Sequence, residues 1–162
     1  MAEIVTNATA AQIRHAVLGF RSQSIAKALP LNATQTIFTV SAGRIVIMSL
    51  YGVVTTVVGG TTPAAKYVAT PTVGSANDMC TTLTITTDEA GMMWALPQAV
   101  GTALVGAAST GKSGSVSGVG VNGQIVAPGT IGFNCSAADA TGAVTHTLIY
   151  IPLDDAARVV AS

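Results

Sequence analysis

The sequence predicts an all-β protein, a single β-sandwich or jelly-roll-like domain with an extended N-terminal arm. The β-branched residues Thr, Val and Ile make up about a third of the chain, and such residues suit pleated, half-buried strands better than helices. Charged residues are only 9% and aromatic residues 4%, so the apolar content is mostly small or aliphatic. Short apolar runs alternate with Gly, Pro, Asn and Asp turns, as in sandwiches and barrels.

Residues 1–33 are predicted to form the arm, and residues 34–162 the sandwich. Three of the seven basic residues lie in the arm: Arg14, Arg21 and Lys27. Ile13, Val17 and Phe20 have the spacing of one helical face, but the stretch is too short and too interrupted to fold alone. We therefore expect an extended segment, with a helical turn or two, that becomes ordered by docking on another surface.

The strand patterns of the sandwich begin at Thr34. We expect strands, in order, at residues 34–40, 44–51, 53–58, 65–70 and 82–86. Gly52 separates the second from the third, and residues 59–63 form a turn. In the fifth, Leu83 and Ile85 share one face and threonines the other. Trp94, the only tryptophan, is predicted to be a core anchor.

The second half of the chain contains the clearest strand patterns. Residues 106–120 are rich in Gly and Ser and are predicted to be a pliable loop. Further strands are expected at residues 129–136, 143–153 and 157–162. Their inward side chains would be Ile131, Phe133 and Cys135 in the first, and Val144, His146, Leu148 and Tyr150 in the second.

Charge and hydropathy exclude several classes of partner. Seven Lys and Arg balance seven Asp and Glu, so no basic footprint for nucleic acid is present. The most apolar stretch, residues 45–58, is shorter than the ~20 residues of a membrane-spanning helix and is interrupted by Ser, Gly and Thr. The start of the chain lacks the pattern of a secretory signal. Cys80 and Cys135 lack metal or redox spacing and are expected to be two buried thiols rather than a disulfide.

One motif points to nucleotide chemistry. The letters GAASTGKS, from Gly106 to Ser113, fit the phosphate-loop pattern G-x-x-x-x-G-K-[ST]. A working phosphate loop opens a helix whose first amide groups bind the phosphates. Glycines at 114, 118, 120 and 123 oppose such a helix, and no βαβ succession surrounds the motif. We interpret it as a chance match in an outward-pointing loop with a solvated Lys112, and expect no nucleotide.

Catalytic and metal sites find little support in the sequence. His146 lies mid-strand between threonines and is interpreted as a packed or hydrogen-bonded residue rather than a base. The paired carboxylates Asp88–Glu89 and Asp154–Asp155 are expected to be solvated caps at turns. Two histidines and two cysteines, none at ligand spacing, provide no metal set. No catalytic residue, cofactor or metal is therefore predicted.

Two stretches resemble a known group of proteins. Residues 126–162, VAPGTIGFNCSAADATGAVTHTLIYIPLDDAARVVAS, resemble the C-terminal segment of small structural proteins from the virion gene clusters of tailed bacteriophages. Residues 36–58, TIFTVSAGRIVIMSLYGVVTTVV, are similar to the opening strands of that group. The chain departs from the group at DDAARVV, where a Gly is expected between the acid and Ala.

The resemblance implies a capsid decoration (head cement) protein. Such a protein is made in the host cytoplasm, forms a homotrimer on the outer capsid surface, and bridges major capsid protein subunits without catalysis. The arm would add a strand to a capsid sheet edge, and its contacts would be the cations Arg14, Arg21 and Lys27 with the apolar Ile25, Leu29 and Leu31. The alternative is a tail or fibre β-domain that binds carbohydrate, which would need exposed aromatic side chains. Neither alternative involves a membrane.

Overall fold

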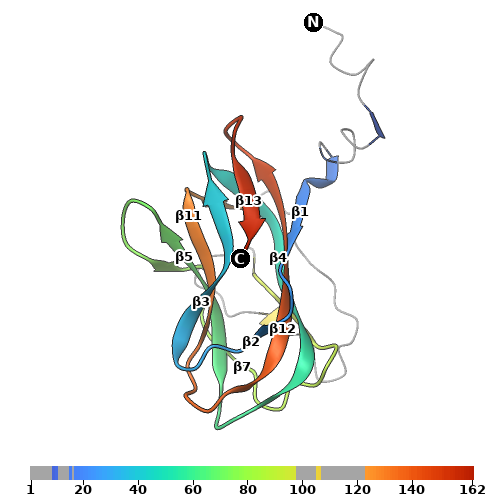
Figure 1. The fold of residues 1–162 in the computed structure, drawn as a ribbon, viewed down its shortest axis with the longest axis vertical. Coiled ribbons are helices and arrows are strands. Elements are labelled where there is room, and N and C mark those ends of the chain that lie inside the picture. Colours follow the sequence, from blue (N-terminus) through green and yellow to red (C-terminus); the bar gives the residue numbers. More distant parts are fainter. Residues whose placement is uncertain (1–8, 11–14, 16, 98–104, 107–122) are drawn as a thin grey trace, which may run out of the picture.

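Two antiparallel sheets form the protein, as the fold class predicted. The computed structural model describes residues 9–10, 15, 17–97, 105–106 and 123–162. These residues form thirteen strands in a seven-stranded and a six-stranded sheet. Figure 1 shows the sheets as two layers, with β3, β5 and β11 on the left and β4, β12 and β1 on the right, while β13 and β2 lie near the middle of the view. The prediction of an all-β sandwich-like domain is confirmed.

The seven-stranded sheet is built on the long pair β4 and β12. The strand order across this sheet is β1-β12-β4-β8-β9. In addition, β2 pairs with β12 and β10 pairs with β4. The strands are β1 (Phe20–Gln23), β2 (Lys27–Ala28), β4 (Ile45–Gly59), β8 (Met93–Ala95), β9 (Val105–Gly106), β10 (Gln124–Val126) and β12 (Thr141–Pro152).

Strand β4 is continuous, and the predicted break at Gly52 is wrong. Gly52 pairs with His146 of β12 and Trp94 of β8, so hydrogen bonding runs through it. A Cβ at this position would lie 3.2 Å from both the His146 Nδ1 and the Tyr67 hydroxyl. Glycine is therefore required by close packing inside the sheet, and not by a turn. The apolar stretch 45–58 lies within this strand, and no helix of the described residues is long and apolar enough to cross a membrane.

The six-stranded sheet has the order β13-β3-β11-β5-β6, with β7 also paired to β5. Its strands are β3 (Ala33–Ser41), β5 (Ala64–Pro71), β6 (Asn77–Asp78), β7 (Leu83–Thr84), β11 (Gly129–Cys135) and β13 (Arg158–Ala161). The predicted strand over residues 82–86 reduces to the two residues of β7. Ile85 is nevertheless fully buried, and its N–H donates to the Pro63 carbonyl (2.8 Å) instead of to a strand partner.

Aromatic side chains fill the space between the sheets. Trp94 stacks on Phe133 at a centroid distance of 5.7 Å, and Phe133 meets Tyr67 edge-on at 5.3 Å. Trp94 is fully buried, which confirms it as a core anchor. The inward sets predicted for β11 and β12 are also confirmed: Ile131, Phe133 and Cys135, and Val144, His146, Leu148 and Tyr150. Both cysteines are free and buried, as expected.

Two polar clasps hold the turns at the ends of the sandwich. Asp154 accepts hydrogen bonds from the Arg44 backbone N–H (2.7 Å) and guanidinium (3.0 Å), which lowers the pKa of this carboxyl. Asp139 accepts from the hydroxyl and the backbone N–H of Thr61 (2.8 and 3.0 Å), and its pKa is lowered as well. Both carboxylates are therefore used in tying distant turns together.

Candidate interaction surface

The N-terminal segment lies along the edge of the seven-stranded sheet. Phe20 pairs with Tyr150, and the antiparallel register continues along β12 to Ala28, which pairs with Ala143. Between and beyond β1 and β2, the Ser24 N–H donates to the His146 carbonyl (2.9 Å) and the Leu29 N–H to the Gly142 carbonyl (3.1 Å). On one side of this segment, the backbone hydrogen-bonding groups are thus paired with strand β12 of the same chain. The opposite side of β1 forms the sheet edge.

An aromatic column fixes the start of this segment. The Gly19 N–H donates to the His15 carbonyl (3.0 Å), which closes one helical turn, and Gly19 has a φ of +78° that ends it. His15 then stacks on Phe20 (4.5 Å between centroids), and Phe20 stacks on Tyr150 (5.8 Å). The Tyr150 hydroxyl accepts from the Val159 N–H (3.2 Å), so the column continues into β13. The segment is therefore held against both sheets.

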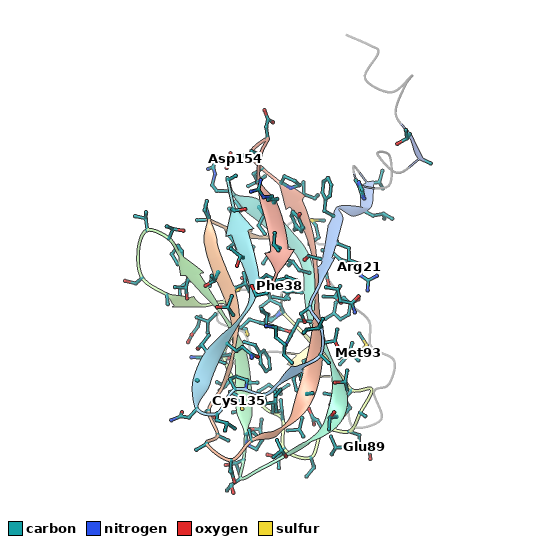
Figure 2. The ribbon with its side chains drawn as sticks, viewed as in Figure 1. Arg21, Phe38, Glu89, Met93, Cys135 and Asp154 are labelled. Carbon is teal, nitrogen blue, oxygen red and sulfur yellow. The ribbon has the colours of Figure 1, made fainter. Side chains whose placement is uncertain are left out.

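Three of the predicted contact residues are exposed on this segment. Arg21 lies on β1 and points to the outside of the sheet (Figure 2), where its guanidinium donates to the Gln23 side chain (2.6 Å). Ile25 is 78% exposed and Leu31 57% exposed. Arg14 lies outside the described residues, and its predicted contact is not placed by the structure.

Two other predicted contact residues serve the chain's own fold. Leu29 is only 6% exposed and belongs to the core, so the prediction that it fills a partner's pocket is wrong. Its N–H bond to Gly142 brings its side chain inward, against the sandwich. The Lys27 ammonium donates to the Thr36 carbonyl of the opposite sheet (3.3 Å), so it bridges the two sheets and does not face outward to a partner's carboxylate as predicted.

Additional apolar residues of the segment are exposed. Val17 and Leu18 are 70% and 66% exposed, and Phe20 is 38% exposed. We call the exposed apolar residues of this segment the N-terminal ridge: Val17, Leu18, Phe20, Ile25 and Leu31. The sequence spacing predicted that Val17 and Phe20 lie on one helical face. Gly19 ends the helical turn between them, so Phe20 belongs to strand β1 instead. Five of the ten exposed large apolar side chains among the described residues belong to the ridge.

His146 occupies the middle of the sandwich, as its interpretation as a packed strand residue predicted. Its Nδ1 lies 3.1 Å from the Tyr67 hydroxyl, and its backbone N–H donates to the buried Ser24 hydroxyl (3.0 Å). Burial, assisted by the charge of Lys27, lowers the pKa of His146 to about 3, so the imidazole is neutral near pH 7. Burial also raises the pKa of Tyr67 well above its usual value. His146 and Tyr67 therefore form a buried, hydrogen-bonded pair.

Asp88 differs from the predicted solvated cap. Its carboxylate accepts a hydrogen bond of 2.6 Å from the Trp94 indole N–H and is partly buried. Burial raises the pKa of Asp88, and the Trp94 hydrogen bond opposes that rise. The described residues contain no cluster of three or more His, Cys, Asp and Glu that could hold a metal ion. Of the motif from Gly106 to Ser113, only Gly106 is described, as the end of β9, and the outward direction predicted for the rest falls outside the described residues.

Comparison of the chain with protein-family models, with curated proteins and with solved structures gives no match. The N-terminal ridge is therefore interpreted from its own geometry. It presents branched aliphatic and aromatic side chains beside one cation, Arg21, on a segment that the sheet holds in place. Such an arrangement is suited to contact with a protein surface.

Proposed function

We propose that the chain is a non-catalytic structural protein of a tailed-phage virion that binds the outer surface of the capsid and stabilises the shell. The resemblance of residues 36–58 and 126–162 to virion proteins supports this class. The proposed partner is the major capsid protein, and the proposed contact is the N-terminal ridge. A chain with 9% charged residues and zero net charge suits a protein that functions within an assembly.

The observation that carries this proposal is an exposed apolar ridge on an anchored segment. Leu29 is buried in the core, and Ser24 is 4% exposed and bonded to the His146 N–H. Ile25 and Leu31 project from the same short segment, at 78% and 57% exposure. Backbone hydrogen bonds of the neighbouring residues Ser24, Leu29 and Asn32 already order this segment, so binding loses less conformational entropy than it would from a free arm.

The free edge of β1 provides a second mode of contact. The side of β1 away from β12 is unpaired among the described strands, so its amide and carbonyl groups can extend a partner's sheet. Arg21, at the middle of this short strand, would pair with a carboxylate next to the added strand. Ridge packing would then contribute affinity, and backbone pairing would fix orientation.

The carbohydrate-binding alternative requires exposed aromatic rings. Trp94 and Tyr67 are fully buried, and Tyr150 is 6% exposed beneath Phe20. Tyr51 is half-buried in the sheet. Among the described residues the exposed rings are Phe20 and its stacking partner His15, and none of the tyrosines or Trp94 extends this pair into a wider platform, so we favour the capsid-binding function.

The test is co-sedimentation of the purified chain with expanded and unexpanded capsids of the phage that encodes it. We expect binding to expanded capsids, and at least a tenfold weaker affinity for Ile25→Asp and Leu31→Asp. Val73→Asp is the matched control, since Val73 is 89% exposed in the turn after β5, outside the ridge. A wild-type chain that ignores expanded capsids, or a control that loses binding equally, contradicts the proposal.

A further inference from the structure

The backbone of β1 has one side without a partner among the described strands. Hydrogen bonds between antiparallel strands alternate, so successive residues direct their N–H and C=O groups to opposite sides. The Ser24 N–H donates to the His146 carbonyl of β12 (2.9 Å), which sets this alternation. Ser22 therefore faces β12 as well, whereas Arg21 and Gln23 direct their backbone groups away from the sheet. These two residues offer two donors and two acceptors to an added strand.

A β-bulge limits the length of this free edge. β1 and β2 pair with β12 in registers that differ by one residue, so Ile25 and Ala26 together lie opposite Thr145. Ile25 projects at this bulge and is 78% exposed. At the other end, the turn before β1 closes at Gly19, whose φ is +78°. An added strand can therefore pair along the four residues of β1, Phe20–Gln23.

The other sheet ends are less suited to an added strand. β13 has four residues, but the Val159 N–H already donates to the Tyr150 hydroxyl of the other sheet (3.2 Å). The strands β6, β7 and β9 span two residues each. Among the described strands, β1 therefore offers the longest edge on which the backbone groups are free to pair.

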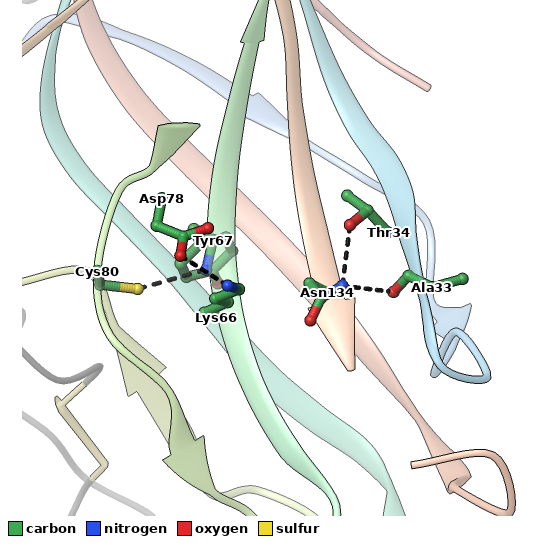
Figure 3. Close-up of polar contacts among 7 residues, drawn as sticks. All are labelled: Ala33, Thr34, Lys66, Tyr67, Asp78, Cys80 and Asn134. Carbon is green, nitrogen blue, oxygen red and sulfur yellow. Dashed lines mark hydrogen bonds and ion pairs between the residues drawn. The ribbon is translucent and has the colours of Figure 1, made fainter. Parts of the chain in front are cut away.

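Charge also distinguishes the β1 edge from the edge at β6. There, Lys66 of β5 is paired with Asp78 of β6 (2.6 Å), as Figure 3 shows. Arg21 donates instead to the neutral side chain of Gln23 (2.6 Å), and it belongs to no ion pair among the described residues. Because Arg21 is exposed, a carboxylate on a partner can reach its guanidinium.

A strand added to β1 would continue both faces of the sheet. Arg21 and Gln23 lie on the outer face, where their side chains meet, and Phe20 lies on the inner face, where it stacks on Tyr150. Acidic side chains of the partner would therefore suit the outer positions beside Arg21, and aliphatic ones the inner positions beside Phe20. Since successive side chains of a strand point to opposite faces, these requirements correspond to acidic and aliphatic residues in alternation.

We infer that the free edge of β1 binds an extended protein segment, about four residues long, in which acidic and aliphatic residues alternate. The inference rests on the proposed function in assigning this segment to a capsid subunit. Pairing along so short an edge provides few contacts, so an isolated segment should bind with a Kd of about 1 mM. Within an assembly, many copies of the contact would raise the overall affinity.

The first experiment follows the backbone amide NMR signals of the full chain during titration with a synthetic peptide. The probe is an acetylated and amidated hexapeptide of alternating Glu and Val, and the same peptide with Lys in place of Glu is its control. We expect the Arg21 and Gln23 amide signals to shift more than that of Ser22, which faces β12. The Lys peptide should bind about tenfold more weakly. No shift at Arg21 and Gln23 up to about 5 mM peptide, or equal binding of both peptides, would overturn the inference.

Exchanging the charge of Arg21 provides a gain-of-function test. Arg21→Glu should reverse the preference, so that the Lys peptide binds more tightly than the Glu peptide. Arg158→Glu is the matched control, because Arg158 is an exposed arginine on the four-residue edge strand β13 of the other sheet. A reversal by Arg158→Glu, or none by Arg21→Glu, would overturn the assignment to β1.

Two substitutions of Gln23 separate backbone pairing from side-chain contact. Gln23→Pro removes the outward N–H, and proline is tolerated at an edge strand where the N–H faces solvent. Gln23→Ala removes the side chain and keeps the N–H. Gln23→Pro should bind the Glu peptide about tenfold more weakly than Gln23→Ala, and equal affinities would refute strand addition. Thermal unfolding of each variant checks that it is folded.

Co-sedimentation with expanded capsids distinguishes a failure of this inference from a failure of the proposed function. If the edge contact operates on the capsid, Gln23→Pro and Arg21→Glu should each weaken capsid binding about tenfold. Capsid binding that neither substitution changes would refute the edge as the contact while the proposed function stands. Peptide binding at β1 by a chain that ignores capsids would support the edge site and contradict the proposed function.

Discussion

Replacing Leu29 with alanine tests whether the N-terminal segment is part of the folded domain. Leu29 is 6% exposed and packs in the core, and its N–H donates to the Gly142 carbonyl. Truncating a buried leucine removes apolar contacts and leaves a cavity, at a cost of about 3 kcal/mol. For a chain of this size, that loss lowers the melting temperature by roughly 6–12 °C.

Leu31→Ala is the internal control, because Leu31 lies two residues away and is 57% exposed. Its effect on the free energy of unfolding should stay within about 0.5 kcal/mol. Urea unfolding followed by Trp94 fluorescence measures both variants, and unchanged m-values would show that the same surface unfolds in each. If the two substitutions differ by less than about 1 kcal/mol, Leu29 is not a core residue, and the segment does not belong to the domain.

Three other perturbations address the buried polar groups. The His146 pKa falls from 6.5 to about 3 on folding, so stability is complete above pH 6.5 and is lost as pH falls toward 3. Between pH 7 and 5 this group lowers the free energy of unfolding by about 2 kcal/mol. Denaturant titrations at several pH values should show that the free energy of unfolding of His146→Gln depends less steeply on pH than that of the wild type. Equal pH dependence in the two proteins would refute this role of His146. Asp88→Ala leaves the Trp94 indole N–H without its acceptor and should cost about 1–3 kcal/mol, measured by urea unfolding, whereas no change would mean that the hydrogen bond is dispensable. Both cysteine thiols are buried and should react with a thiol reagent only after unfolding; rapid reaction of the native protein would contradict their burial.

The fold class and the inward faces of the main strands could be predicted because they depend on local alternation. In β12, successive side chains point to opposite sides, so Val144 and Leu148 identify the core face without knowledge of any partner strand. The same applies to Ile131 and Phe133 in β11. Which strands pair could not be predicted in this way. Phe20 pairs with Tyr150, 130 positions away in the sequence, and no local pattern in either segment specifies that partner.

The contact site could be predicted only in part, for the same reason. Composition identified the N-terminal segment and its exposed residues Ile25 and Leu31, but burial depends on which strand the segment meets. Docking on β12 directs Leu29 into the core and Lys27 toward Thr36, so these two residues serve the fold. Gly52 was predicted to break the strand because glycine is typical of turns. It lies inside β4, where the space that His146 and Tyr67 occupy requires a residue without a side chain.

The pairing of the N-terminal segment with β12 also constrains the order of folding. Strands β1 and β2 find their hydrogen-bond partners in β12, and β3 needs β13 at one of its sides, so segments from opposite halves of the chain must meet. Strand pairs between residues far apart in the sequence form more slowly than local structure does. During synthesis, the segment with Leu29 and the ridge has no docking site until β12 is available. Chaperones would therefore meet its apolar side chains before the sandwich closes.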